Sequence, residues 1–118
     1  SDLATEDYLS KNAEGVKRFV HASLRGWQFA LKNPKKAVED EITIVPSLDL
    51  AKGVAEIGVV RDLAVTPAVE KHGLGWFDPA EMKSSLDLMV KYVGVGAHPP
   101  TAADLYATGF LPNPPVKP

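Results

Sequence analysis

The sequence predicts a mainly α-helical chain, with four to five helices and a short strand at most. Apolar residues recur at helical spacing over residues 13–32, and proline stands at two helix starts, Pro34 and Pro79. Only residues 42–45 form a β-branched run. The length of 118 residues suits one domain, and 45% hydrophobic with 24% charged residues is typical of a folded protein.

The clearest helix is expected over residues 13–32, with Asn12 as its cap. Asn33 and Pro34 should end it and begin the next helix, because the residue before proline avoids the α region. Trp27 lies on the apolar face, so we expect core packing for it in preference to ligand stacking. The apolar face comprises Val16, Phe19, Val20, Ser23, Leu24, Trp27, Ala30 and Leu31.

The second helix, from 34 to about 41, is intrinsically weak because its lysines come first and its acids last, against the helix dipole. Lys35 with Glu39 and Lys36 with Asp40 can offset part of this cost as pairs four residues apart. The run 42–45 is interpreted as a frayed helical end in preference to a short strand.

A third helix is expected from about 48 to 63, capped by Ser47 and weakened by Gly53 and Gly58, which can admit a close neighbour. Thr66 and Pro67 are expected to open a connecting stretch. Residues 71–77 then form a glycine-punctuated loop that carries two adjacent aromatic residues.

The last main helix should begin at Pro79 behind the cap Asp78 and end at Gly94-Val95-Gly96, with a short turn at residues 101–104. A first helical turn is expected after the cap Thr5. Residues 1–112 form the helical portion, and the proline-rich residues 113–118 form an extended tail. The buried face of the last main helix is expected to comprise Met82, Leu86, Met89, Val90 and Val93.

Several kinds of site are disfavoured. A net charge of −2 gives no field for nucleic acid, and no partner of that kind is expected. The chain has no cysteine, and His21, His72 and His98 lack metal-ligand spacing, so no metal site or cofactor is expected. The acids at 39–41 look like a solvated helix end, and no catalytic residues are predicted.

Three blocks of the sequence together resemble a known family. They are residues 16–30 with the Asn-Pro corner at 33–38, the loop 73–78 and the ending 106–112. They are similar to the C-terminal segment of periplasmic solute-binding proteins of ABC transporters for nitrate, sulfonates, taurine and thiamine-pyrimidine precursors. The resemblance implies that this chain is a helical fragment of a two-lobed α/β type II periplasmic-binding-protein fold.

The resemblance implies a solute-binding component of an ABC importer, which is not an enzyme. Its partners would be an ABC permease and a small organic or anionic solute, such as a sulfonate, nitrate or a pyrimidine precursor. Its location would be periplasmic or extracytoplasmic, and membrane-associated in a Gram-positive source. The alternatives are a thiamine-pyrimidine synthase-like enzyme on the same scaffold and a free-standing helical interaction domain.

Three residues are candidates for ligand contact: Thr5, His72 and Trp76. Thr5 lies in a stretch that resembles the point where the family's chain passes from strand to helix. His72 and Trp76 belong to the glycine-punctuated loop, and loops held by a scaffold often carry binding residues. Packing is nevertheless the favoured role for Trp76. As an isolated piece, the chain is also expected to expose apolar surface and self-associate.

Overall fold

The computed structural model describes residues 3–94, 96 and 98–118, and this part of the chain is helical without any strand. The mainly α prediction is confirmed, with six α-helices where four to five were expected. Val95, in the middle of the expected glycine stop, lies outside the described residues. The elements are α1 (Glu6–Lys11), α2 (Ala13–Lys32), α3 (Pro34–Ile42), α4 (Leu50–Ala64), α5 (Pro67–His72), α6 (Pro79–Tyr92) and the 3₁₀-helix η1 (Ala102–Asp104).

Side-chain caps begin four of these helices. In each, an oxygen of the residue before the helix accepts a hydrogen bond from a first-turn amide that has no helical partner. The caps and their N···O distances are Thr5 to Tyr8 (3.2 Å), Asp49 to Lys52 (2.9 Å), Thr66 to Val69 (3.3 Å) and Asp78 to Ala80 (2.8 Å). The caps predicted at Thr5 and Asp78 are therefore confirmed.

Of the two other predicted caps, Ser47 is wrong, and Asn12 holds the cap position of α2 without a side-chain bond. Helix α4 begins at Leu50 behind Asp49 and not behind Ser47, because the Asp49 carboxylate reaches the Lys52 amide and suits the positive helix end. Asn12 precedes α2 but makes no side-chain capping bond to it. Its Nδ2 instead donates to the Tyr8 carbonyl oxygen at 3.3 Å, so the amide serves the end of α1.

The stretch after Thr66 was expected to be a connection and is the helix α5. Its signals are all present in the sequence: Thr66 caps it, Pro67 fixes its first turn, and Gly73 follows it with φ +96°. Six residues are too few for a hydrophobic repeat to reveal. The caps alone therefore mark this helix.

The corner between α2 and α3 agrees with the sequence analysis. Helix α2 ends at Lys32, and α3 begins at Pro34. The Ile44 and Val45 amides bond the Glu41 carbonyl oxygen at 2.9 and 2.8 Å, so the β-branched run is a helical end. Helix α3 packs against both α2 and α4.

Gly53 explains how α4 approaches α3 so closely. A Cβ at this position would lie 2.8 Å from Cγ1 of Val38, which is the most buried side chain in the described chain. The expectation of a close neighbour is confirmed at Gly53. At Gly58 a Cβ would meet nothing within 4 Å.

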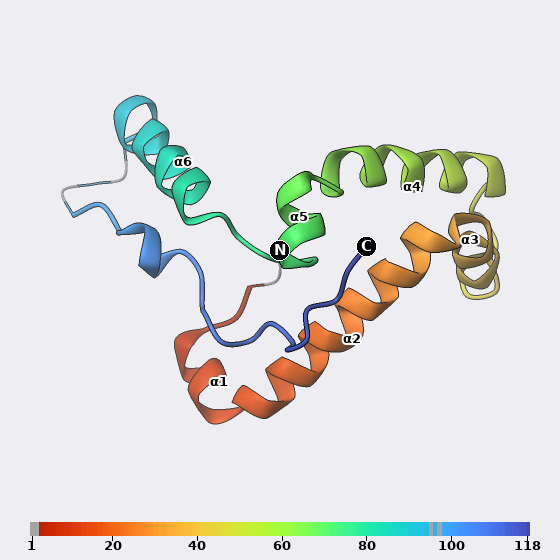
Figure 1. Ribbon diagram of the computed structural model, residues 1–118, viewed down its shortest axis with the longest axis horizontal. Coiled ribbons are helices and arrows are strands. Elements are labelled where there is room, and N and C mark those ends of the chain that lie inside the picture. The colour runs from red at the N-terminus through yellow and green to blue at the C-terminus, as the bar shows by residue number, and fades with distance from the viewer. Residues whose placement is uncertain (1–2, 95, 97) are drawn as a thin grey trace.

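The helices α2 and α4 form two long arms that meet at α3, while α6 stands apart from them (Figure 1). Helix α5 and the last residues of the chain lie between these parts. The buried cluster comprises Leu31, Leu74 and Val116, with Leu24, Val65 and Val69 packed around it. The chief core therefore joins α2, the end of α4, α5 and the tail.

The arrangement is open. Its accessible surface is 8829 Å², about 40% more than the roughly 6,200 Å² typical of a compact protein of this mass. The radius of gyration is 17.0 Å, against about 13.5 Å for a compact domain of this length. None of the described helices has the length and apolar content of a membrane span.

Two predictions of burial are corrected by this openness. Trp27 was expected in the core, but 49% of it is exposed, because nothing in the described chain covers that part of the α2 face. On α6 only Leu86 of the expected face is buried, while Met89, Val90 and Val93 are exposed. Periodicity correctly predicted these helices but not what covers them.

Candidate functional site

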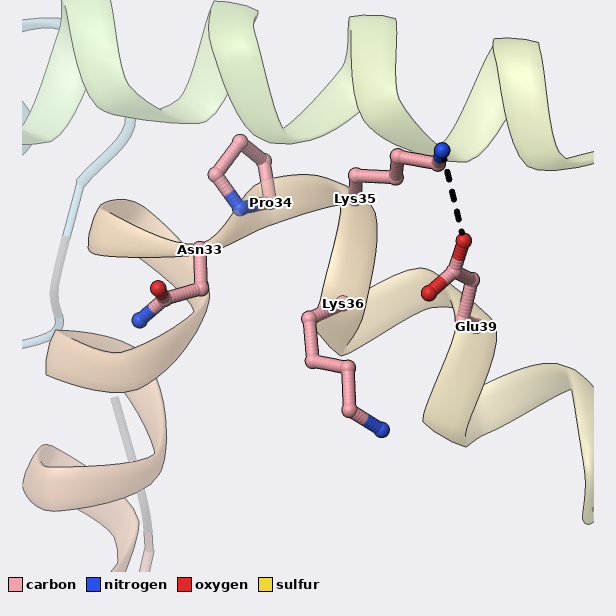
Figure 2. A pocket seen from close by; sticks show the side chains of 5 residues that line it. All are labelled: Asn33, Pro34, Lys35, Lys36 and Glu39. Atoms are coloured by element: carbon pink, nitrogen blue, oxygen red, sulfur yellow. Dashed lines mark ion pairs between the residues drawn. The ribbon is translucent and has the colours of Figure 1, made fainter.

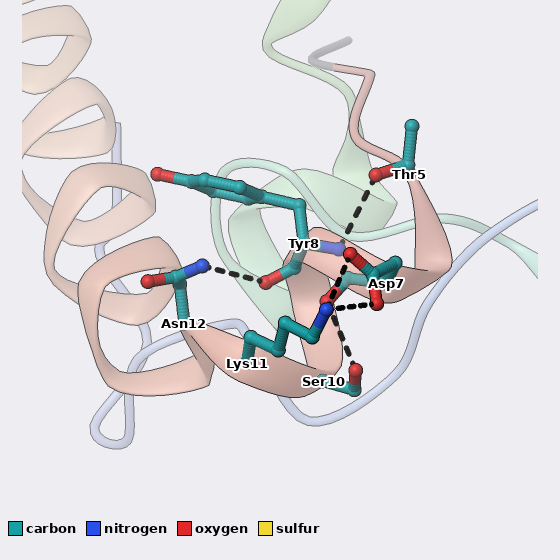
Figure 3. A network of polar contacts seen from close by, with 6 residues as sticks. All are labelled: Thr5, Asp7, Tyr8, Ser10, Lys11 and Asn12. Carbon is teal, nitrogen blue, oxygen red and sulfur yellow. Dashed lines mark hydrogen bonds and ion pairs between the residues drawn. The ribbon is translucent and has the colours of Figure 1, made fainter.

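Thr5 takes part in the polar network that forms α1 (Figure 3). Its hydroxyl oxygen accepts from the Tyr8 amide, and Lys11 pairs with Asp7 at 2.7 Å one turn further on. Ser10 Oγ donates to the Asp7 carbonyl oxygen at 2.9 Å. Every residue of this network is exposed, including Thr5. In the structure, Thr5 therefore caps the start of α1.

His72 and Trp76 are brought together by the structure. Their ring centroids lie 4.1 Å apart with an angle of 15° between the planes, which is a stacked pair. Both residues are partly buried. Stacking leaves the outer ring faces to other contacts, and a partly open aromatic surface suits a planar apolar or π-bearing group.

The backbone between the two rings reverses through two glycines. Gly73 has φ +96° and Gly75 has φ +81°, values that side-chain-bearing residues rarely adopt. Between them Leu74 is buried in the core cluster, so the loop is anchored at its centre. The chain therefore presents His72 and Trp76 from a fixed loop.

Among the described residues, Thr5 makes hydrogen bonds within α1 and none to His72 or Trp76. Two of the three sequence candidates thus form a local unit, and the third lies on a separate helix start. The glycines in the sequence predicted the loop but not the stacking within it. The available signal for the stacking was that the two residues stand four positions apart, with the end of a helix and a glycine turn between them.

Two hollows lie elsewhere, near α3. One of about 320 Å³ is lined by Asn33, Pro34, Lys35, Lys36 and Glu39 (Figure 2). The other, of about 470 Å³, is lined by Lys35, Leu50, Ala51 and Val54. Both are open to solvent and contain none of the three candidates.

The lysines at the first hollow are already paired. Lys35 Nζ lies 3.7 Å from Glu39 Oε1, and Lys36 Nζ donates to Asp40 Oδ1. The hydrogen bond with Asp40 raises the pKa of Lys36. Because each positive charge has an acid beside it, the hollow has little net attraction for an anion.

The remaining pKa shifts also arise from local surface pairs. A hydrogen bond from Lys17 lowers the pKa of Glu14, and hydrogen bonds from Thr101 lower the pKa of Asp104. Among the described residues, no cluster of three histidine or acidic side chains could hold a metal ion. The resolved pKa shifts thus belong to hydrogen-bonded groups at the surface.

A junction that the sequence analysis did not identify involves Val116 and Lys117. Val116 is buried against Leu31 and Leu74, and Lys117 hydrogen-bonds the end of α5. The only signals of this junction in the sequence were an aliphatic residue and a lysine that stand between prolines. Neither signal specifies a partner 46 residues away in sequence.

Comparison with protein families matches part of the chain. The family model described as NMT1/THI5 like matches residues 3–37, which span α1, α2 and the start of α3. No curated protein and no solved structure matches the chain. The match supports the family resemblance and, at the level of the family, a substrate-binding type of function. It includes Thr5 and stops before His72 and Trp76.

Proposed function

We propose that this chain is the helical portion of a solute-binding protein that delivers a small organic or anionic solute to an ABC importer. The solute class is a sulfonate, nitrate or a pyrimidine precursor, and the partner is an ABC permease. The protein acts outside the cytoplasm, in the periplasm or attached to the membrane of a Gram-positive cell. It binds its solute without converting it.

The observation that carries this proposal is the uncovered apolar face of the helix that the family match includes. Phe19 and Trp27 of α2 are 59% and 49% exposed. They share one stripe with Leu24 and Leu31, which pack inward. An apolar stripe covered along only one side favours a helix that leans on a larger body, as it would in a two-lobed receptor.

Within that receptor the chain would have two roles. The α2–α3–α4 unit buttresses one lobe, and the stacked rings of His72 and Trp76 offer a surface to a planar solute. Thr5 remains a candidate through its place in the matched segment. A stacked ring pair favours a pyrimidine precursor over a compact anion such as nitrate.

Calorimetry on the gene product that carries this chain tests the proposal. Titration with taurine, nitrate, bicarbonate and pyrimidines should give saturable binding of one solute, recovered unchanged by mass spectrometry. Trp76→Ala should weaken this binding, while the control Tyr92→Ala, at a 71% exposed aromatic residue of α6, should leave it within about twofold, since a site away from the ligand couples weakly to it.

Other results would separate the alternatives. Conversion of the solute during the titration would support an enzyme of the pyrimidine-synthase type and contradict our proposal. Absence of binding to every solute, together with a stable protein partner, would support a free-standing interaction domain.

A further inference from the structure

The last residues of the chain, 112–118, are called the tail segment, and they pack against α2 and the end of α5. The surface that they contact, called the seat, is formed by side chains of α2, carbonyl groups at the end of α5 and the loop that follows. It comprises Gln28, Leu31, the carbonyls of Glu70 and Lys71, Gly73 and Leu74. Figure 1 shows the tail segment running beside α2 towards this region.

The seat takes one apolar side chain. Val116 is only 8% exposed and packs with Leu31 and Leu74, the two buried residues that α2 and the loop supply. Its neighbours in the tail segment, Pro115 and Lys117, are exposed. The tail segment therefore inserts a single aliphatic residue, as an extended peptide does in a pocket.

The seat also binds the backbone of the tail segment. The Leu74 amide donates to the Val116 carbonyl oxygen at 2.8 Å. Gln28 Nε2 donates to the Lys117 carbonyl oxygen at 2.6 Å. Two consecutive carbonyl groups of the tail segment thus accept hydrogen bonds from two different elements, α2 and the loop, which fixes the direction of the segment.

The seat also binds the positive charge of Lys117. Its ammonium donates to the carbonyl oxygens of Glu70 and Lys71, at 2.7 Å for Glu70. These carbonyls end α5 and have no helical donor, and the helix dipole makes this end negative. A cation at this place is favoured, whereas a carboxylate would be repelled.

Gly73 makes the close approach possible. A Cβ there would lie 2.7 Å from Cβ of Pro115 and 3.0 Å from the Val116 carbonyl oxygen. The prolines of the tail segment restrict its free conformations, so less entropy is lost when it is seated. Shape, backbone bonding and charge all select the same extended sequence.

We propose that the seat is a peptide-binding site for an extended Pro-Val-Lys segment, which residues 115–117 of this chain occupy in cis. The partner class is a peptide with an aliphatic residue followed by lysine. When its own segment is released, the seat accepts an equivalent peptide in trans. This inference does not depend on the proposed transport function.

The test uses the full chain carrying Val116→Asp and Lys117→Met, which releases the tail segment. A fluorescent peptide with the sequence of residues 112–118 should bind this variant saturably. It should bind the unchanged chain at least about tenfold more weakly, because that seat is filled. A peptide with aspartate in place of the valine should not bind. Equal binding to both chains, or none to a variant that keeps its helical circular dichroism, would overturn the proposal.

A second measurement decides the case if the double variant loses its helices. In the full chain carrying only Lys117→Met, hydrogen exchange of the Leu74 amide should be about tenfold faster than in the matched control Lys52→Met. Lys52 is an exposed residue of α4, outside the seat. Equal exchange in the two variants would show that Lys117 does not hold the tail segment.

Discussion

The junction around Val116 and the helix α6 both carry apolar side chains, but the surroundings of these side chains differ. At the junction, Leu31, Leu74 and Val116 from three separate segments bury one another. On α6, Leu86 is buried, but Leu88 is 58% exposed. The difference teaches that an apolar stripe forms a core only where another segment of the chain returns to cover it.

The largest effect expected from this comparison is at Leu31. Leu31→Ala removes a side chain that is 4% exposed, and a cavity in this small core should cost about 2–4 kcal/mol of unfolding free energy. The matched control Phe19→Ala, on the open side of the same helix, should cost about 0.5 kcal/mol or less. Urea unfolding followed by circular dichroism measures both. Similar losses of unfolding free energy in the two variants would contradict the predicted difference between the covered and the open side of α2.

Gly73→Ala should have the next largest effect. The substitution requires a strained φ of +96° and a Cβ too close to Pro115, so it should cost about 1–3 kcal/mol. Gly26→Ala is the control: it lies within α2 with nothing within 4 Å, and should stabilise by about 0.5–1 kcal/mol. The same unfolding experiment applies. A neutral Gly73→Ala would mean that the tail segment does not press on the loop.

A third prediction concerns the open surface of α4. Val59 and Leu63 lie four residues apart on one helix face and are both exposed. We expect the isolated chain to self-associate, and Val59→Lys with Leu63→Lys to reduce this while changing stability by only about 0.5 kcal/mol. Light scattering over a dilution series measures the mass. A monomer at all concentrations in the unchanged chain would refute the prediction.

The smallest effect is a pH dependence at η1. The Thr101 hydroxyl and amide donate to Asp104 Oδ2 at 2.6 and 2.7 Å, which lowers the pKa of Asp104 below its ordinary value of 3.8. Since the folded pKa is depressed, this local stabilisation is present above pH 3.8 and is lost as the pH falls through the lowered pKa.

Nuclear magnetic resonance titration of the Asp104 carboxyl checks this effect. The midpoint should lie below 3.8, and Thr101→Ala should move it upwards by removing the hydroxyl donor. A midpoint at or above 3.8 in the unchanged chain would show that the turn does not hold the carboxylate.

The local signals in the sequence predicted most helices well. Pro34 and Pro79 mark helix starts as expected, and α2 has the predicted bounds. Errors arose where two residues compete for one role, as Ser47 and Asp49 do, or where a helix is too short for periodicity, as α5 is. These are local choices that depend on small energy differences between caps.

The site and the core were less predictable because they depend on contacts between distant segments. The loop of His72 and Trp76 was identified from its glycines, but the stacking depends on how α5 ends. The contact of Lys117 with Glu70 joins residues that no local pattern connects. Burial of Trp27 was predicted from periodicity, which shows the side of a helix that is apolar and not the partner that covers it.

Acrylamide quenching of Trp27 fluorescence, in a chain carrying Trp76→Phe, tests most directly whether the open α2 face is built to lean on a larger body. In the isolated chain at high dilution, Trp27 should be quenched as readily as a half-exposed indole. In the gene product that carries this chain, quenching should fall several-fold, because burial shields an aromatic ring from solvent. Equal quenching in both proteins, or a shielded Trp27 in the dilute isolated chain, would contradict the account.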